Sequence, residues 1–574
     1  MVTQLDSVEV LVVGSGWAGG IVSAEMAKEG REVVCLERGE SQAIEDYIHV
    51  KDELRFSLRH EMMQDFSKET ITSRHIRDIE ALPVRSQSDM HWGTDLGGAS
   101  VHWNGVTFRN LPYDFEIYSQ TVDRYGEEKI PEEMTIQDWG ITYDELEPYY
   151  DRFEKTAGIS GEESEFGPER SNPYPTPPMA DTAITRLFKK SARNLGYHPF
   201  QFPSANLSET YENPDGQTIS QCQYCAFCET FGCDYGAKSD PLVTVLPTAR
   251  EHENFELRTR SNVRRVLYDG EQANGVRYVD TRTGQEYEQP AEVVVLAGFT
   301  FTNSRLLLLS EIGTPYNPET GEGVIGKNYT MHSLSNMGAR GYFNDRKFNT
   351  YMGAGALGAC FDDFAGDNMD HTDLDFIHGG EIDCPQWGQR PIEHNHVPQG
   401  TPTWGREFKE KSLFYANRNI RVRWQVGTMP WQFNYVDLDP TYTDQYGDPL
   451  LRVTNEYTDQ DRNIMNFGLE LCKEVLEEMG ADIIDMEESS LAEEFPNVFY
   501  GQHYAGGVIM GDDPETSAVN NYLQMWDAEN VFVVGASAFP HFSNFNPTGT
   551  VGALAYRASE GIEQYLENGG GSLV

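Results

Sequence analysis

Basic residues, cysteines and long apolar runs are all scarce in this chain of 574 residues. Only 44 lysines and arginines oppose 91 aspartates and glutamates, which gives a net charge of −47 at pH 7. Such a charge repels phosphate backbones and anionic lipids, so nucleic acid and anionic lipid surfaces are not expected partners. No run of about 18 apolar residues occurs, so the sequence predicts no transmembrane helix.

The acidic composition indicates a protein that works in concentrated salt. Self-repulsion at this charge destabilises a compact protein in dilute salt, whereas concentrated salt screens the charges within a few ångströms. We therefore expect a halophilic host; the alternative is an acidic protein that docks on a basic partner. The first residues (MVTQLDSVEV) show no basic region and no signal cleavage site. The expected location is cytoplasmic, or exported and membrane-associated through a partner subunit.

Short apolar runs are present, and their placement indicates the fold. Residues 8–13 (VEVLVV) predict a buried strand, which is followed by a glycine turn, a helix and a second strand at 32–37. Similar strands recur at 293–297 and, near the C-terminus, at 531–534. Strands of one parallel sheet are thus spread along the whole chain, which predicts an α/β fold with a discontinuous nucleotide-binding domain.

The segments between these strands predict a second, inserted domain of the α+β type. They are richer in proline, tyrosine, tryptophan and acidic residues, and they contain many turn signals. We therefore assign a Rossmann-like nucleotide-binding domain to residues 1–115, 221–330 and 496–574. The inserted domain is expected at residues 116–220 and 331–495.

A glycine pattern typical of dinucleotide binding follows the first strand. Gly14, Gly16 and Gly19 lie between strand and helix, where glycine permits a tight turn and close approach to a pyrophosphate. Glu37 ends the second strand, where a carboxylate can accept hydrogen bonds from ribose hydroxyls. Strand, turn, helix, strand and acid occur in register, which favours a bound nucleotide over a glycine turn without a ligand. The motif does not distinguish NAD from FAD.

Four of the eight cysteines, Cys222, Cys225, Cys228 and Cys233, lie within twelve residues. Their spacing, C-x2-C-x2-C-x4-C, is closely related to spacings in iron–sulfur proteins, where one loop wraps a face of a cluster. Structural zinc usually takes two pairs separated by a longer finger, and disulfides between such close residues are strained. An iron–sulfur cluster is the preferred interpretation; zinc, disulfides and no role are the alternatives.

Four further motifs resemble those of the glucose-methanol-choline (GMC) oxidoreductases. They are residues 96–105 (LGGASVHWNG), 326–332 (GKNYTMH), 503–511 (HYAGGVIMG) and 546–558 (NPTGTVGALAYRA). Within the family, the chain is most similar to FAD-dependent catalytic subunits of bacterial gluconate, fructose and glucose dehydrogenases, and more distantly to pyranose oxidase. The resemblance implies FAD, an inserted substrate-binding domain of the GMC type, and hydride transfer from a hydroxyl-bearing carbon to the flavin.

The resemblance also implies two catalytic residues. His503 matches the base that takes the hydroxyl proton, and Asn546 matches its partner, which is histidine or asparagine in different branches. The residue chemistry agrees, because an imidazole with a pKa of about 6.5 can be neutral at working pH, whereas an amide only orients and polarises the hydroxyl. His541 and Asn544 are expected close to the site, without a direct catalytic role.

The residues expected to contact FAD follow from the same motifs. His102 matches a histidine that is covalently bonded to the flavin in pyranose oxidase, while other relatives with this residue hold FAD non-covalently, so both states are open. The full expected set is Gly14, Ser15, Gly16, Trp17, Ala18, Gly19, Glu37, Arg38, Gly97, Gly98, Ser100, His102, Asn104, Val263, Ala297, Gly535, Ala536, Pro547 and Thr548.

The cysteine-rich loop 222–233 decides between possible electron acceptors. Related dehydrogenases hold a [3Fe-4S] cluster in the equivalent loop, although with other cysteine intervals, so the resemblance favours [3Fe-4S] over [4Fe-4S]. It implies oxidation of a sugar, sugar acid or glycoside, with electrons passing through the cluster to a cytochrome or quinone on a partner, and a small subunit as a further partner. The alternatives are an oxidase of the pyranose oxidase type with structural cysteines, and a non-catalytic flavin-binding subunit.

Overall fold

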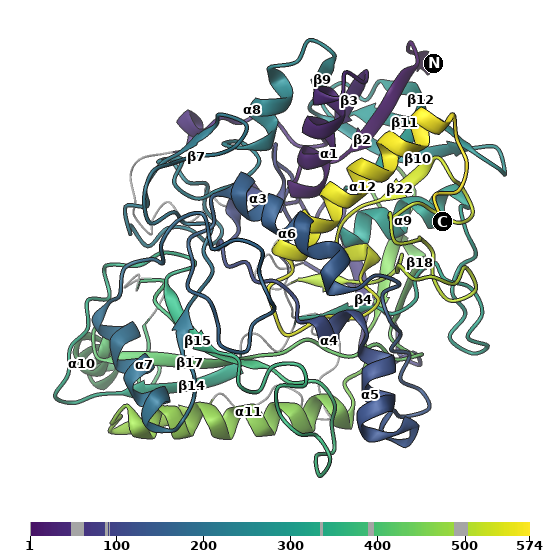
Figure 1. Cartoon of the computed structure of the whole chain (residues 1–574). Coiled ribbons are helices and arrows are strands. Elements are labelled where there is room, and N and C mark those ends of the chain that lie inside the picture. Colours follow the sequence, from purple (N-terminus) through teal and green to yellow (C-terminus); the bar gives the residue numbers. More distant parts are fainter. Residues whose placement is uncertain are drawn as a thin grey trace.

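The structure is a computed structural model, shown in Figure 1. It describes residues 2–47, 62–85, 90, 92–332, 337–388, 395–486 and 503–574. Within these residues the strands form an eight-stranded, a six-stranded and a four-stranded sheet and two small two-stranded sheets.

The eight-stranded sheet contains the strands that the sequence spreads along the chain. Its order is β10-β11-β12-β2-β3-β9, and β1 and β22 also pair with β12. Pairing is parallel from β12 through β2 and β3 to β9, and also between β12 and β22. The predicted α/β fold is confirmed. The bounds are β1 Thr3–Gln4, β2 Val8–Val13, β3 Val33–Leu36, β9 Phe255–Arg258, β10 Ser261–Tyr268, β11 Ala273–Asp280, β12 Glu286–Leu296 and β22 Val531–Val533.

Helices cover this sheet because its central strands are apolar on both faces. Helix α1 (Trp17–Lys28) packs against β2 and β3 and lies beside α12 (Thr548–Asn568) and α8 (Val245–Arg250). Figure 1 shows the dark N-terminal helix α1 and the yellow C-terminal helix α12 running side by side. The two ends of the chain therefore build one layer, as expected for a discontinuous domain.

The six-stranded sheet, β20-β14-β17-β16-β15-β6, has one apolar and one polar face. Its apolar face packs against α7 (Ala183–Asn194) and against α11 (Asp459–Glu478), the long helix at the bottom of Figure 1. The bounds are β6 Phe200–Gln201, β14 Met337–Tyr342, β15 Gly358–Phe361, β16 Glu381–Pro385, β17 Asn419–Gln425 and β20 Ile483–Met486.

The four-stranded sheet, β18-β19-β4-β5, joins segments from both predicted domains. Strand β4 (Ile71–Arg74) comes from the first predicted nucleotide-binding segment and pairs in parallel with β19 (Pro449–Thr454) of the inserted one. The proposed division of the chain stays a prediction, and its boundary at 495/496 lies outside the described residues. The other two strands are β5 Leu82–Pro83 and β18 Tyr435–Thr443.

The remaining elements are short connections around these sheets. None of the described helices combines the length and the apolar character that a membrane span requires. The bounds are α3 Ala99–His102, α4 Pro112–Phe115, α5 Ile117–Tyr125, α6 Tyr143–Ala157, α9 Thr300–Ser310, α10 Gly405–Tyr415, η1 Ile44–Asp46, η3 Glu127–Lys129, η5 Ala536–Ala538, β7 Tyr211–Glu212, β8 Thr218–Ile219, β13 Thr330–Met331 and β21 Tyr504–Ala505.

Candidate active site

A cavity of about 300 Å³ lies at the carboxyl ends of the parallel strands. It is lined by Val13 at the end of β2, by Leu36 and Glu37 at the end of β3, and by Ala297 after β12. Ligands of open α/β sheets bind at this edge, because strand ends and helix N-termini converge there.

Most residues predicted to contact FAD line this cavity. Gly19 and Gly97 do not line it, but both contact residues that do. A Cβ on Gly19 would lie 1.9 Å from the Gly14 carbonyl oxygen. The Gly97 N–H donates to Ser15 Oγ at 2.9 Å. The predicted residues that line it are Gly14, Ser15, Gly16, Trp17, Ala18, Glu37, Arg38, Gly98, Ser100, His102, Asn104, Val263, Ala297, Gly535, Ala536, Pro547 and Thr548.

The glycine turn has the shape and polarity that a diphosphate requires. Gly14 has φ +97°, and a Cβ there would lie 2.6 Å from the Ala297 carbonyl oxygen, so only glycine fits. Gly16 precedes α1 without a side-chain cap, which leaves the helix N-terminus facing the cavity. The Glu37 carboxylate accepts from the Ser15 N–H at 3.0 Å and from the Gly39 N–H at 2.9 Å. These residues fit FAD.

His503 lines the same cavity and is paired with His332. Their Nδ1 atoms are 3.1 Å apart, the His332 N–H donates to the His503 carbonyl oxygen at 3.1 Å, and Phe542 stacks on the His332 ring with a 5.3 Å centroid separation. Burial, followed by the positive charge of Arg423, lowers the pKa of His503 to about 4. The imidazole is therefore neutral at ordinary pH. His332 belongs to the motif 326–332, but no role was assigned to this residue from the sequence.

The segment 541–546, whose Phe542 stacks on the His332 ring, contains two asparagines with unused hydrogen-bonding groups. Asn546 is buried and its Oδ1 has no hydrogen-bond partner, and neither amide atom of Asn544 has one. Asn546 is not among the lining residues of the cavity, whereas Pro547 and Thr548 are. Buried polar atoms without partners cost free energy, so water or a ligand is expected to satisfy them.

The polar face of the six-stranded sheet meets the same segment. Glu381 and Asp383 on β16 lie opposite Gln425 and Arg423 on β17, and all four side chains are buried. The Arg423 Nε donates to Asp383 Oδ1 at 2.8 Å and the Gln425 Nε2 donates to Glu381 Oε1 at 2.7 Å, while Glu381 Oε2 has no partner. Gly427, just beyond β17, approaches so closely that a Cβ would lie 2.4 Å from the Ser543 carbonyl oxygen.

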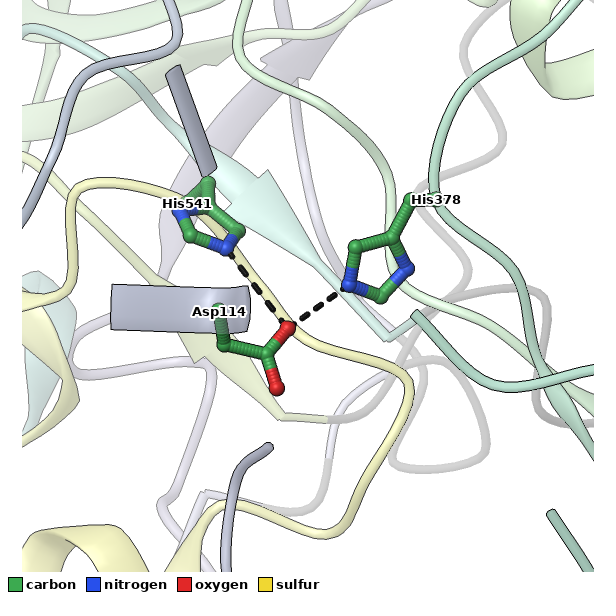
Figure 2. Close-up of side chains that lie close together, drawn as sticks. All are labelled: Asp114, His378 and His541. Carbon is green, nitrogen blue, oxygen red and sulfur yellow. Dashed lines mark hydrogen bonds and ion pairs between the residues drawn. The ribbon is translucent and has the colours of Figure 1, made fainter. Parts of the chain in front are cut away.

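His541 belongs to a different, fully buried cluster with Asp114 and His378 (Figure 2). His378 Nε2 lies 2.7 Å and His541 Nε2 lies 3.9 Å from Asp114 Oδ1. Burial raises the pKa of Asp114, but the two histidines outweigh burial and lower it to about 2. The ligand atoms are close enough for a metal ion, which sequence reasoning did not predict.

Hydrogen bonding argues against a metal in this cluster. The Trp139 Nε1–H donates to His541 Nδ1 at 3.1 Å, so a neutral His541 carries its proton on Nε2, the nitrogen that faces Asp114. A protonated Nε2 has no lone pair for a metal. His378 lies between two acceptors, with Nδ1 3.1 Å from the Gly379 carbonyl oxygen and Nε2 2.7 Å from Asp114 Oδ1, so only the protonation of His541 disfavours a metal. The cluster is best explained as an anchor that ties helix α4 to the segment 541–546.

We predict that Asp114→Asn lowers the free energy of unfolding by about 1–3 kcal/mol, because the amide leaves a buried imidazole N–H without its charged acceptor. Urea unfolding followed by tryptophan fluorescence measures this. Asp370→Asn, at an exposed turn, is the matched control and is expected to stay within about 0.5 kcal/mol of the parent protein. Equal stability of both variants would show that the cluster anchors nothing.

None of the four cysteines of the loop 222–233, all of which the structure describes, forms a disulfide. Among the described residues, no three of these sulfur atoms lie within 4.8 Å of one another. Thiolates that share one zinc ion would lie closer together than this, because each Zn–S bond is about 2.3 Å long. Backbone N–H groups donate to the sulfurs, from Tyr224 to Cys222 and from Ala237 to Cys233, both at 3.4 Å. Hydrogen bonds to the sulfur atoms are a feature of iron–sulfur sites.

The loop is attached directly to the lining of the cavity. The Thr230 N–H donates to the His102 carbonyl oxygen at 2.6 Å, and Glu229, which sequence reasoning missed, itself lines the cavity. His102 also lines it, and a covalent bond from His102 to the flavin stays a prediction.

Comparisons with known proteins agree with this arrangement. GMC oxidoreductase family models match residues 202–334 and 430–555. The chain is 40% identical to the gluconate 2-dehydrogenase flavoprotein of Pantoea cypripedii, over 99% of this chain and 95% of that protein. It is 29% identical to 2-methyl-1,2-propanediol dehydrogenase of Mycolicibacterium austroafricanum (98% and 96% covered) and 22% identical to the fructose dehydrogenase large subunit of Gluconobacter japonicus (98% and 99%).

Solved structures show the same fold. Pyridoxine 4-oxidase from Mesorbium loti superposes with a TM-score of 0.61 at 17% identity, covering 97% of this chain and 99% of that one. Formate oxidase superposes with a TM-score of 0.61 at 16% identity, covering 99% of both chains. With the family models and the nearly full-length relative, these findings show that the chain belongs to the GMC oxidoreductase family and is an FAD-dependent oxidoreductase acting on CH–OH groups.

Proposed function

We propose that this chain is the catalytic subunit of a dehydrogenase that oxidises a hydroxyl of a sugar acid or a related sugar. The observation that carries this proposal is the group of buried polar atoms without partners on Asn544, Asn546 and Glu381. Buried donors and acceptors that the protein itself leaves unused suit a polyhydroxylated substrate and would reject an apolar alcohol. The name of the relative at 40% identity, a gluconate 2-dehydrogenase flavoprotein, supports a sugar acid.

His503 takes the hydroxyl proton in this proposal, and His332 sets its tautomer. Burial, followed by the charges of His503 and Arg423, lowers the pKa of His332 well below its usual range. The Asn544 backbone opposes this shift as an acceptor, although no full hydrogen bond to Nε2 forms. We therefore assign the His332 proton to Nε2, which leaves its Nδ1 to accept from His503 Nδ1–H. His503 Nε2 then keeps a lone pair for the substrate. Asn546 orients the hydroxyl, and bound FAD would supply the hydride acceptor.

The cysteine loop provides the way out for electrons. We propose that Cys222, Cys225, Cys228 and Cys233 supply the ligands of an iron–sulfur cluster, with [3Fe-4S] favoured, next to the FAD site. A hydride removes two electrons together, whereas such a cluster carries one, so the electrons leave singly to a cytochrome or quinone on a partner. The fructose dehydrogenase relative is a large subunit, which supports a smaller partner for this chain. The charge of −47 supports a salt-rich host.

Purification in concentrated salt, followed by FAD and iron assays and a dye-linked screen, tests this proposal. We expect FAD and iron in constant ratio, dye reduction with a sugar acid, and little peroxide in air. Stoichiometric peroxide from an iron-free protein would establish the oxidase alternative instead. A protein with bound FAD and no turnover on any sugar or sugar acid would point to a non-catalytic subunit.

A further inference from the structure

Lys238 is a lysine buried between the cavity lining and the cysteine loop, and only 1% of its surface is exposed. Its Nζ donates to the carbonyl oxygens of Trp103 at 2.8 Å, Cys228 at 2.7 Å and Phe231 at 2.8 Å. An ammonium group has three N–H donors and no acceptor, so these contacts use its whole capacity. The geometry is that of a charged lysine with all donors satisfied.

The three carbonyl groups belong to two different parts of the chain. Trp103 stands between His102 and Asn104 in the cavity lining, whereas Cys228 and Phe231 belong to the cysteine loop. The neighbouring residue strengthens the junction, because the Ser239 carbonyl oxygen accepts from Trp103 Nε1 at 3.0 Å. Lys238 therefore joins the predicted flavin-contacting segment to the loop that carries the thiols.

The loop needs such an external support. Tyr224, Ala226 and Thr230 have φ values of 53°, 70° and 64°, a region that residues other than glycine rarely adopt. Each costs free energy, and strained backbone of this kind persists only where surrounding contacts determine it. Lys238 contacts Cys228 and Phe231, which lie in the C-terminal half of the same loop.

The buried charge of Lys238 also requires compensation. Its hydrogen-bond acceptors are neutral carbonyl groups, and a buried ammonium is stable only with negative charge nearby. Lys238 Nζ contacts the carbonyl oxygens of Cys228 and Phe231, so its charge lies directly against the cysteine loop. Asp240, two residues along the chain and buried, also interacts with the Lys238 charge. Thiolates on a metal cluster would place further negative charge at this point.

We propose that Lys238 is a positioning residue that holds the cysteine loop against the flavin-contacting segment and balances the thiolate charge of the loop. This inference rests on the proposed iron–sulfur route, in which two electrons from the substrate leave singly through the loop to a one-electron acceptor on a partner. Lys238 thereby sets both the distance over which the electrons travel and the potential at which the loop accepts them.

The test compares Lys238→Gln and Lys238→Arg in the holoenzyme, with iron per FAD, FAD per chain and the reduction potential of the cluster by EPR-monitored titration as readouts. Lys238→Gln is expected to lose at least half of its iron, and the remaining cluster to have a lower potential, because a nearby positive charge favours the reduced form. Lys238→Arg keeps the charge and is expected to restore the potential. If Lys238→Gln does not fold, Lys238→Arg is the variant whose iron content and cluster potential are compared with the parent protein.

Lys129→Gln is the matched control, because Lys129 also donates to two carbonyl oxygens, those of His371 and Leu374, away from the cavity lining. It is expected to keep iron, FAD and potential unchanged. Iron content and potential equal to the parent protein in Lys238→Gln would overturn the proposal. An iron-free parent protein would instead refute the proposed electron route and the charge-balancing role. If the parent protein lacks iron, an FAD content of Lys238→Gln equal to that of the parent would refute the positioning role as well.

Discussion

Replacing His503 with alanine is expected to lower kcat for substrate oxidation by about 10²- to 10⁴-fold, the range that a positioned general base contributes. The substitution removes the one imidazole that both lines the cavity and pairs with His332 through Nδ1. FAD content should not change, because the residues around the predicted diphosphate site are untouched. Steady-state dye reduction, together with the rate of flavin bleaching by substrate without air, measures the effect on the chemical step.

The matched control is His198→Ala, a partly exposed histidine that pairs with Asp363 at 2.8 Å outside the cavity lining. Its kcat should equal that of the parent protein. If His503→Ala kept full flavin reduction on every substrate that the parent protein oxidises, another group would have to be the base.

The pH profile offers an independent check of His503 in the unaltered enzyme. The pKa of this histidine is lowered to about 4, so the neutral, proton-accepting form is present above that pH and is lost as pH falls through it. We therefore expect kcat/KM to be flat from about pH 5.5 to 8 and to decline below about pH 4.5. An acid limb near the ordinary histidine pKa of about 6.5 would show that burial does not act on this ring as the structure implies.

Replacing Cys228 with serine is expected to remove most of the iron and to lower electron delivery to a one-electron acceptor such as cytochrome c by at least about tenfold. A serine oxygen is a poor replacement for a thiolate, which is the ligand that iron–sulfur clusters require. FAD and its reduction by substrate should be largely retained, since the base and the hydride-accepting site are elsewhere. Iron analysis and separate measurement of flavin reduction and cytochrome reduction distinguish the two half-reactions.

Cys472→Ser is the control for this experiment, because Cys472 is a buried cysteine of helix α11 that belongs to the apolar core beside the six-stranded sheet. It should lose stability without losing iron. Full iron content in Cys228→Ser would exclude Cys228 as a ligand. Zinc instead of iron in the parent protein would establish the structural alternative for the whole loop.

Features encoded by neighbouring residues could be predicted from the sequence. Gly14 is required by a positive φ and by the approach of the Ala297 backbone, so the nucleotide turn is visible as a motif of a few residues. The buried parallel strands are visible because each is a short run of apolar side chains. The four cysteines of the loop 222–233 could be recognised for the same reason, since their chemistry depends on their spacing.

Contacts between distant segments were decided by the tertiary structure alone. His332 and His503 pair across 171 residues, and no local pattern encodes which nitrogen of one ring meets the other. His541 is close to Asn546 in sequence, but the path of the chain turns it toward Asp114 and away from the cavity. Lys238 could not be distinguished from a surface lysine until folding placed the carbonyl groups of Trp103 and Cys228 around its ammonium group. Short-range sterics leave a signature in the sequence, whereas the environment of a buried charge is created only when remote segments pack together.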